Sequence, residues 1–407
     1  MVSTKEEWGY YGLFKYIGRF SRLFGSFPFI MSSEPKVSTL QKYYGLFIIL
    51  PWINAVFFYS LYTEITDITE NSRHAWPVIY LIYTAFSVLY IDMAVWTAPT
   101  RIYSWISCLK NIEKILIRTK ETDQKELFKC KVLTVYLITT LFAIFANSVK
   151  LCMELDKCTY FNFAYKFNGL FFYTLCRICE LFLFVILIFR VHKATKIMNE
   201  ELKKLLHERD VNNRLILRNN YMIGSRFEAQ KFSHGDGTEK IRELIKFYTT
   251  VNDVIKTVME SGEMGLFLYI MGNLVRLMTR ANDYVYLNYS FHGENFDGSY
   301  MLASILGIFW CTQIVAKSFL FCEGPHQIQR QLQETQDIIA RLKKKYHEDN
   351  MSNELHLFLR LTRLNRPTFS PLSVCTLNRG LVAKILGCAA TYILAFIQLE
   401  MYENSKK

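Results

Sequence analysis

Apolar residues gather along this chain in windows of about 20 residues, separated by longer polar segments. Such a window is long enough for a helix to cross the hydrocarbon core of a bilayer, which is about 30 Å thick. Seven windows have this length, and they lie at 43–63, 76–98, 132–152, 167–189, 264–287, 299–321 and 380–399. The pattern therefore predicts an all-α membrane protein with seven transmembrane helices.

The polar segments keep a helical spacing as well. After the fourth window, Ile197, Leu202, Leu205 and Leu206 recur among charged residues, which is typical of an amphipathic helix. Similar patterns precede the fifth window and follow the sixth. We expect these helices to pack together as a cytoplasmic anchor, although helices separately solvated by cytosol would show the same pattern.

The connections differ strongly in positive charge, which predicts the orientation of the chain. One alternating set, which includes the N-terminal segment, holds 37 Lys and Arg residues, and the other holds 6. Cytoplasmic connections carry the excess of Lys and Arg. The N-terminus is therefore predicted to be cytoplasmic and the C-terminus extracellular, which is opposite to a G-protein-coupled receptor.

Windows and orientation together predict the domain organisation. The expected segments are a cytoplasmic N-terminal segment at 1–42, spans one to four at 43–190, a cytoplasmic helical extension at 191–262, spans five and six at 263–321, cytoplasmic anchor helices at 322–379, a seventh span at 380–399 and an extracellular tail at 400–407.

Composition agrees with a membrane protein and argues against several other classes. Of 407 residues, 51% are hydrophobic, with 32 Phe and 25 Tyr. We find no phosphate-binding loop, no hydrolase or zinc-protease motif and no paired Cys and His spacing, so we expect neither an enzyme nor a cofactor or metal centre. The net charge of +12 follows from the orientation bias and from contact with anionic membrane lipid, and no basic-aromatic module suggests nucleic acid.

Two modifications are expected on the outer side. Cys152 and Cys158 flank an outer loop and are candidates for a disulfide in an oxidising exterior. The triplet Asn288-Tyr289-Ser290 is a glycosylation sequon in the outer loop predicted at 281–298.

Polar and aromatic residues inside the spans are the candidates for a ligand pocket that opens to the outside. Polar side chains are costly in lipid and usually face a protein interior or a wet cavity. The candidate lining residues are Tyr80, Tyr83, Asn147, Tyr173, Asn273, Arg276 and Trp310. Two other roles stay open: the aromatic residues could form interfacial belts, and the polar residues could bond one helix to another. For Arg177 and Glu180, one turn apart, the spacing predicts a structural ion pair.

The last window has a polar stripe. Lys384, Thr391 and Gln398 repeat at intervals of seven residues and share one helix face, with Ala395 between them. The stripe can be covered by other helices of the same subunit or by copies of itself around an axis. The second arrangement forms a pore; the pattern alone favours neither.

The sequence resembles the insect gustatory receptor family. The family motif, Thr-Tyr, five mostly apolar residues and Gln-Phe, is similar to Thr391, Tyr392, "ILAFI" and Gln398 here, and Phe369 and Leu377-Asn378 resemble the family's lead-in. Leu399 replaces the motif's Phe, and Ile393 stands where sugar receptors often have Glu.

This resemblance implies a tastant-gated, non-selective cation channel in the plasma membrane of a gustatory neuron dendrite. It implies a homotetramer, or a heteromer with related receptors, in which the last span of each subunit lines the pore. Gln398 would then form the gate, and Thr391 and Tyr392 would stabilise the pore helices. The ligand would be a small organic tastant, with a bitter or plant compound favoured over a sugar. The alternative is a metabotropic or co-receptor-dependent receptor without its own pore.

Overall fold

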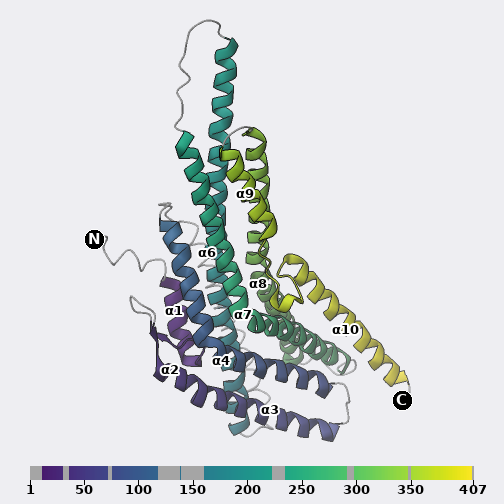
Figure 1. The fold of residues 1–407 in the computed structure, drawn as a ribbon. Coiled ribbons are helices and arrows are strands. Elements are labelled where there is room, and N and C mark those ends of the chain that lie inside the picture. Colours follow the sequence, from purple (N-terminus) through teal and green to yellow (C-terminus); the bar gives the residue numbers. More distant parts are fainter. Residues whose placement is uncertain are drawn as a thin grey trace.

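The computed structural model describes residues 12–30, 36–71, 76–117, 138, 160–221, 234–290, 298–346 and 350–405. Within them the protein is almost entirely helical, which confirms the predicted all-α fold (Figure 1). The main helices are α1 (Gly12–Ser21), α2 (Thr39–Tyr44), α3 (Leu50–Asn71), α4 (Trp76–Ile117), α6 (Tyr160–Tyr221), α7 (His234–Ser290), α8 (Gly298–Lys345), α9 (Asn350–Leu364) and α10 (Arg379–Ser405).

Short elements connect the N-terminal helices. A 3-10 turn, η1 (Arg22–Phe24), leads into the strands β1 (Phe29–Ile30) and β2 (Lys36–Val37), which pair antiparallel, and a π-helical turn, η2 (Gly45–Ile49), joins α2 to α3. Gly25 ends η1 with a φ of +69°, and a Cβ there would lie 2.7 Å from the Cα of Gly45. Glycine is therefore required at position 25, both for its conformation and for this close approach.

Three helices are far longer than a bilayer is thick. The helices α6, α7 and α8 contain 62, 57 and 48 residues. At about 1.5 Å per residue they span roughly 93, 86 and 72 Å, whereas the hydrocarbon core measures about 30 Å. Their polar parts must extend well beyond the membrane, as the periodicity of the connections predicts.

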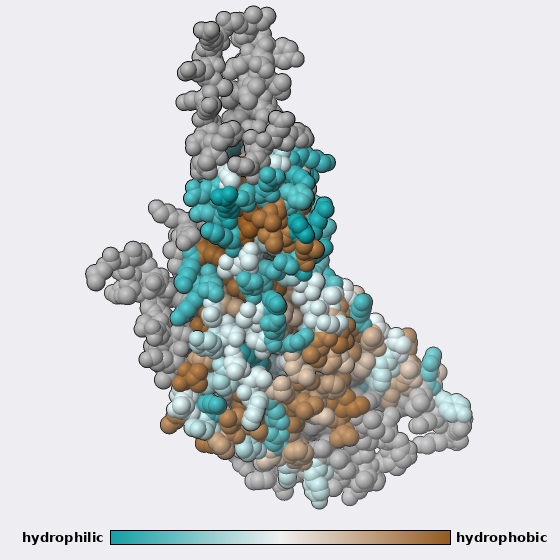
Figure 2. Space-filling view, viewed as in Figure 1, coloured by the Kyte–Doolittle hydropathy of each residue, from teal (hydrophilic) through white to brown (hydrophobic). Residues whose placement is uncertain are grey.

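Hydrophilic and hydrophobic side chains are also distributed unevenly over the surface. In the upper coloured part of the molecule, where α6, α7 and α9 lie, Figure 2 shows mostly hydrophilic side chains around one hydrophobic patch, and hydrophobic side chains are more frequent in the lower part. By length and composition, two stretches among the described residues are apolar enough to cross a membrane, Ser304–Lys345 and Arg379–Gln398. The latter nearly coincides with the predicted seventh span.

The helical extensions pack on one another, rather than standing separately in solvent. Met198 and Leu202 of α6, Ile339 of α8, and Leu355 and Phe358 of α9 are completely buried in one core. A buried polar cluster accompanies them: the Asn199 side chain donates to the Gln331 carbonyl oxygen at 2.9 Å. Asn199 also accepts from the Thr335 hydroxyl at 2.6 Å. The expected helical packing is therefore present within one subunit.

Some predicted boundaries differ from the structure. The predicted outer loops at 64–75 and 281–298 are helical as far as Asn71 and Ser290. The sequon at Asn288 consequently lies in the last turns of α7 and not in a loop. The predicted span at 132–152 falls outside the described residues except for Ile138, which is helical and exposed.

Two buried side chains and a cap fix the start of α10. Phe369 and Leu377 are fully buried, and the Leu377 N–H donates to the Phe369 carbonyl at 2.7 Å. The Asn378 side-chain oxygen then accepts from the Leu381 N–H at 3.0 Å, which satisfies one of the free donors of the first helical turn. The Phe and Leu-Asn positions that precede the last span thus have a structural role.

We expect Asn378→Ala to destabilise α10 by about 1 kcal/mol, because the first turn loses its side-chain acceptor. The thermal midpoint of the purified protein should fall. Asn378→Ser, which retains a capping oxygen, should stay near the parent value, and equal midpoints for the Ala and Ser variants would show that the cap does not contribute.

Candidate functional site

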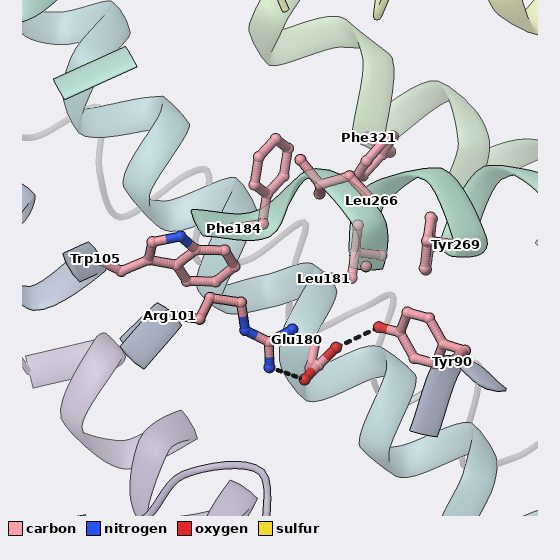
Figure 3. A pocket seen from close by; sticks show the side chains of 11 residues that line it. Tyr90, Arg101, Trp105, Glu180, Leu181, Phe184, Leu266, Tyr269 and Phe321 are labelled. Carbon is pink, nitrogen blue, oxygen red and sulfur yellow. Dashed lines mark hydrogen bonds and ion pairs between the residues drawn. The ribbon is translucent and has the colours of Figure 1, made fainter. Parts of the chain in front are cut away.

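A buried ion pair joins α4 to α6. The carboxylate of Glu180 accepts from the Arg101 guanidinium and from the Tyr90 hydroxyl (Figure 3). The Arg101 and Glu180 residues are only 3% and 6% exposed. Arg101 also donates to the Ala94 carbonyl at 3.0 Å. The charge of Glu180 is therefore satisfied by two partners from α4.

Arg177 lies one turn before Glu180 but binds α7 instead. Its guanidinium donates to the Tyr269 carbonyl at 3.0 Å and to the Asn273 side-chain oxygen at 2.8 Å. The guanidinium carbon also lies 4.7 Å from the ring centroid of Tyr269 and 5.2 Å from that of Tyr90, within the range of a cation–π contact. The predicted Arg177–Glu180 ion pair is thus wrong. Glu180 pairs instead with Arg101, whose long side chain reaches it from the neighbouring helix α4.

Two small cavities open beside these groups. The first, about 20 Å³ in volume, lies among Arg101, Trp105, Glu180, Phe184 and Phe321, with Gly262 and Gly265 on the α7 side (Figure 3). The second, about 10 Å³, lies among Arg177, Asn273, Arg276 and Lys317. Each has room for about one water molecule. Leu181 and Tyr269 line both cavities.

Arginine and tryptophan side chains continue the cluster along α7 and α8. The Arg276 guanidinium carbon lies 5.0 Å from the Trp310 ring centroid, and that of Arg280 lies 5.9 Å from it. Trp310 is 2% exposed. Its ring therefore packs inside the helix bundle and is not available to an interfacial belt.

The structure places part of the predicted ligand site together. Asn273 and Arg276 line the second cavity, and Trp310 contacts Arg276. Tyr80 and Tyr83 lie on α4 and Tyr173 on α6, but their side chains are outside the described residues, as is Asn147 altogether. These assignments remain predictions.

Several cavity residues escaped the sequence analysis. Arg101 lies just beyond the end of the second window at 76–98, and Tyr90 and Tyr269 are two of many aromatic residues in the windows. Gly262 and Gly265 gave the only local signal, because two glycines three residues apart on one helix face leave room for neighbouring side chains. Sequence spacing alone could not show which of these helices are neighbours.

Cysteine residues lie both outside and within the part of the chain that the structure describes. Cys152 and Cys158 lie outside the described residues. Cys176 and Cys179 are buried, unbonded thiols that pack with Leu175 against Ile17. Among the residues that the structure describes, no group of His, Cys, Asp and Glu side chains is arranged to hold a metal ion.

The last helix presents two different faces. Val382, Ile385, Ala389 and Phe396 are buried, and α10 contacts α7 and α8. The stripe predicted from the sequence is exposed instead, at Lys384, Thr391, Ala395 and Gln398, and Tyr392 is half-buried between the faces. This subunit therefore does not cover the stripe with its own described helices.

A salt bridge holds the first residue of α10 to α8. The Arg379 guanidinium donates to both oxygens of Glu323, at 2.7 and 2.6 Å, and the Gln327 side chain donates to the same carboxylate at 2.7 Å. The hydrogen bonds from Arg379 lower the pKa of Glu323 below its usual range. The carboxylate is therefore ionised at neutral pH, and the pair would be lost only as the pH falls through that lowered pKa.

We expect Glu180→Gln to destabilise the protein by on the order of 3–5 kcal/mol, because it leaves the buried Arg101 charge without a carboxylate. Thermal midpoint and surface expression should both fall. The double variant Arg101→Met, Glu180→Gln should recover most of the loss, since no unpaired charge remains and the new amide still accepts from Tyr90.

The exposed pair between Lys203 and Glu334 provides a matched control. Removing its carboxylate with Glu334→Gln should change stability by no more than about 1 kcal/mol. If the Glu180 variant behaved like the Glu334 variant, the buried pair would not be the source of stability that its geometry indicates.

Comparisons with known proteins identify the fold and the family. Two structures of the insect olfactory receptor OR5 from Machilis hrabei are similar to this chain, each with 12% sequence identity and covering 95% of this chain and 98% of the other. The TM-score is 0.66 for the structure in complex with eugenol and 0.62 for the other structure. No curated protein sequence matches the chain. Residues 14–403 match the 7tm chemosensory receptor family, and the chain therefore belongs to that family.

Proposed function

We propose that this receptor is a gustatory receptor that acts as a tastant-gated, non-selective cation channel in the plasma membrane. The observation that carries the proposal is the exposed polar stripe of α10, because it has the form of a pore wall. The ligand is a small organic compound that enters from the outside, with a bitter or plant compound favoured over a sugar. The similar olfactory receptor structure in complex with eugenol supports a small-molecule ligand.

A polar stripe on a membrane helix needs a wet or polar neighbour. Thr391 and Gln398 are exposed on the subunit, whereas the adjacent face carries Ile385, Ala389 and Phe396 into the core. Exposed apolar residues such as Leu394 suit lipid or a second copy, but an exposed amide in lipid is costly. Copies arranged around an axis would turn the stripe towards water, and four Gln398 side chains would form a ring whose amide oxygens tolerate cations.

The assembly is proposed to be a homotetramer or a heteromer with related receptors. A monomer cannot enclose a channel with one such helix. Lys384, at the cytoplasmic end of the stripe, would lie where the proposed pore widens towards the anchor, and Tyr392, half-buried beside Phe396, would hold the helix against its own subunit.

One helix connects the cavities to the proposed gate. Ile314, Lys317 and Phe321 of α8 line the two cavities, and Glu323 of the same helix binds Arg379 at the start of α10. A ligand that needs more space than a water molecule must move the cavity walls, α8 among them. The salt bridge would transmit that movement to α10, and the ligand would thereby favour the open population.

We expect substitutions of Gln398 to change ion conduction. Gln398→Glu should raise the permeability of divalent relative to monovalent cations, and Gln398→Arg should lower the cation conductance severalfold, because each introduces a ring of charge in the pore. Single-channel recording with ligand at saturation measures both effects.

Leu386→Ala is the matched control, because it changes the same helix at an exposed apolar position on a side of α10 away from the polar stripe. Its unitary conductance should equal that of the parent protein. Unchanged conductance and selectivity in the Ala, Glu and Arg variants of Gln398 would rule out the pore assignment.

The same recordings separate a channel from a metabotropic or co-receptor-dependent receptor. Outside-out patches that contain only this chain should open on ligand addition without added nucleotide. Binding of the ligand without any opening would instead favour coupling to another protein.

Substitutions of the Glu323–Arg379 salt bridge test whether it transmits movement from α8 to α10. Arg379→Glu should shift the half-maximal ligand concentration severalfold while leaving unitary conductance unchanged, because two carboxylates would then face each other away from the pore. The charge-swapped double variant, Glu323→Arg with Arg379→Glu, should restore much of the parent response. Equal shifts in the single and double variants would contradict a role for the pair.

A further inference from the structure

The charged residues of α10 are distributed unevenly along the helix. Its two basic residues, Arg379 and Lys384, lie near its beginning, and its two acidic residues, Glu400 and Glu403, lie near its end. The salt bridge to both oxygens of Glu323 neutralises Arg379. Lys384 is therefore the charge that remains at the beginning of α10.

Lys384 lies on the polar stripe and its side chain is exposed. The next residue, Ile385, is buried in the hydrophobic core, so the packing of α10 within its own subunit turns the Lys384 side chain outward. Among the described residues, Lys384 forms no ion pair. Its positive charge therefore acts on whatever lies beside the stripe.

Water in a pore and the lipid headgroups of the inner leaflet would both accept an ammonium group at this depth. The face that carries Lys384 also carries the polar side chains of Thr391 and Gln398, and all three are exposed. Leu386 and Ala390, exposed on another side of the helix, are apolar and suit lipid or a second copy. Because Lys384 shares its face with the polar residues, its position favours the pore.

The length of the helix separates Lys384 from the proposed gate. Lys384 and Gln398 are 14 residues apart, which is roughly 21 Å at a rise of about 1.5 Å per residue. Glu400 is farther still, at 16 residues or roughly 24 Å. Since the Debye length is about 8 Å at physiological ionic strength, Lys384 acts on ions at its own end of the proposed pore, and the acidic end of α10 does not offset it.

We propose that Lys384 makes the channel rectify, by forming a ring of ammonium groups at the cytoplasmic mouth of the pore. The ring repels cations that approach from the cytosol and lowers their local concentration. Cations therefore enter the pore more readily from outside, and the inward current exceeds the outward current at an equal driving force. This inference rests on the proposed channel and on the predicted orientation of α10.

The test is the current–voltage relation of single ligand-gated channels in symmetric salt. In about 0.1 M salt, the unitary inward current should exceed the outward current at least about twofold at equal and opposite voltages, because the potential at a charged mouth changes local ion concentrations severalfold. In about 1 M salt, where the Debye length is about 3 Å, the relation should become nearly linear. A linear relation in the dilute salt, or a larger outward current, would overturn the proposal.

Substitutions of Lys384 separate the effect of charge from that of side-chain size. In the dilute salt, Lys384→Gln should give a nearly linear relation, Lys384→Glu should reverse the asymmetry, and Lys384→Arg should keep the parent relation. Unitary currents are compared, so that a change in the open probability with voltage does not enter the result.

Lys114→Gln is the matched control, because it removes an exposed cation from α4, which packs chiefly on α7, α3 and α6. Its current–voltage relation should equal that of the parent protein. If Lys384→Gln rectified like the parent and like this control, the ammonium group would lie outside the pore and the inference would be wrong.

These recordings distinguish a failure of this inference from a failure of the proposed channel. Ligand-gated currents with the same relation in the parent protein and in the Gln and Glu variants would overturn the role of Lys384 and leave the channel standing. The absence of any ligand-gated current from this chain would overturn the channel and the inference together.

Discussion

The buried charge of Glu180 is the constraint on which the arrangement of the central helices depends. A carboxylate inside a helix bundle must be paired, and Arg101 and Tyr90 of α4 supply its partners. This fixes α4 against α6 in both register and rotation. Tyr90 also lies beside Arg177, which binds α7, so that one polar chain connects three helices.

The helices α6, α7 and α8 are long and continuous, so fixing their positions around Glu180 also fixes the positions of their distant ends. Because α6, α7 and α8 extend from the polar chain into the packing of the helical extensions, the same continuous helices connect the two regions. Pro325 within α8, close to Glu323, removes one helical hydrogen bond near the point where α8 binds α10. A bend of α8 is therefore least costly between the cavities and the packing of the helical extensions, next to the attachment of α10.

The two faces of α10 assign its packing within the chain and its proposed role in an assembly to different residues. Its apolar face packs against α7 and α8, and Asn378 and Arg379 fix its beginning. The polar stripe lies on the exposed side of the helix. Stability and the proposed conduction are thereby assigned to different residues, so that variation at the stripe need not affect folding.

The sequence by itself determined the helical class, six of the helix positions within the described residues and the polar stripe, because hydrophobic length and seven-residue spacing are local properties. It also identified Asn273 and Arg276 as buried polar residues of interest. Only the tertiary structure decided that Glu180 pairs with Arg101 instead of Arg177, that three cations from α6, α7 and α8 meet at one cavity, and that the stripe of α10 faces away from its subunit. These outcomes depend on which helices are neighbours and how each is rotated, and periodicity along one helix carries no information about either.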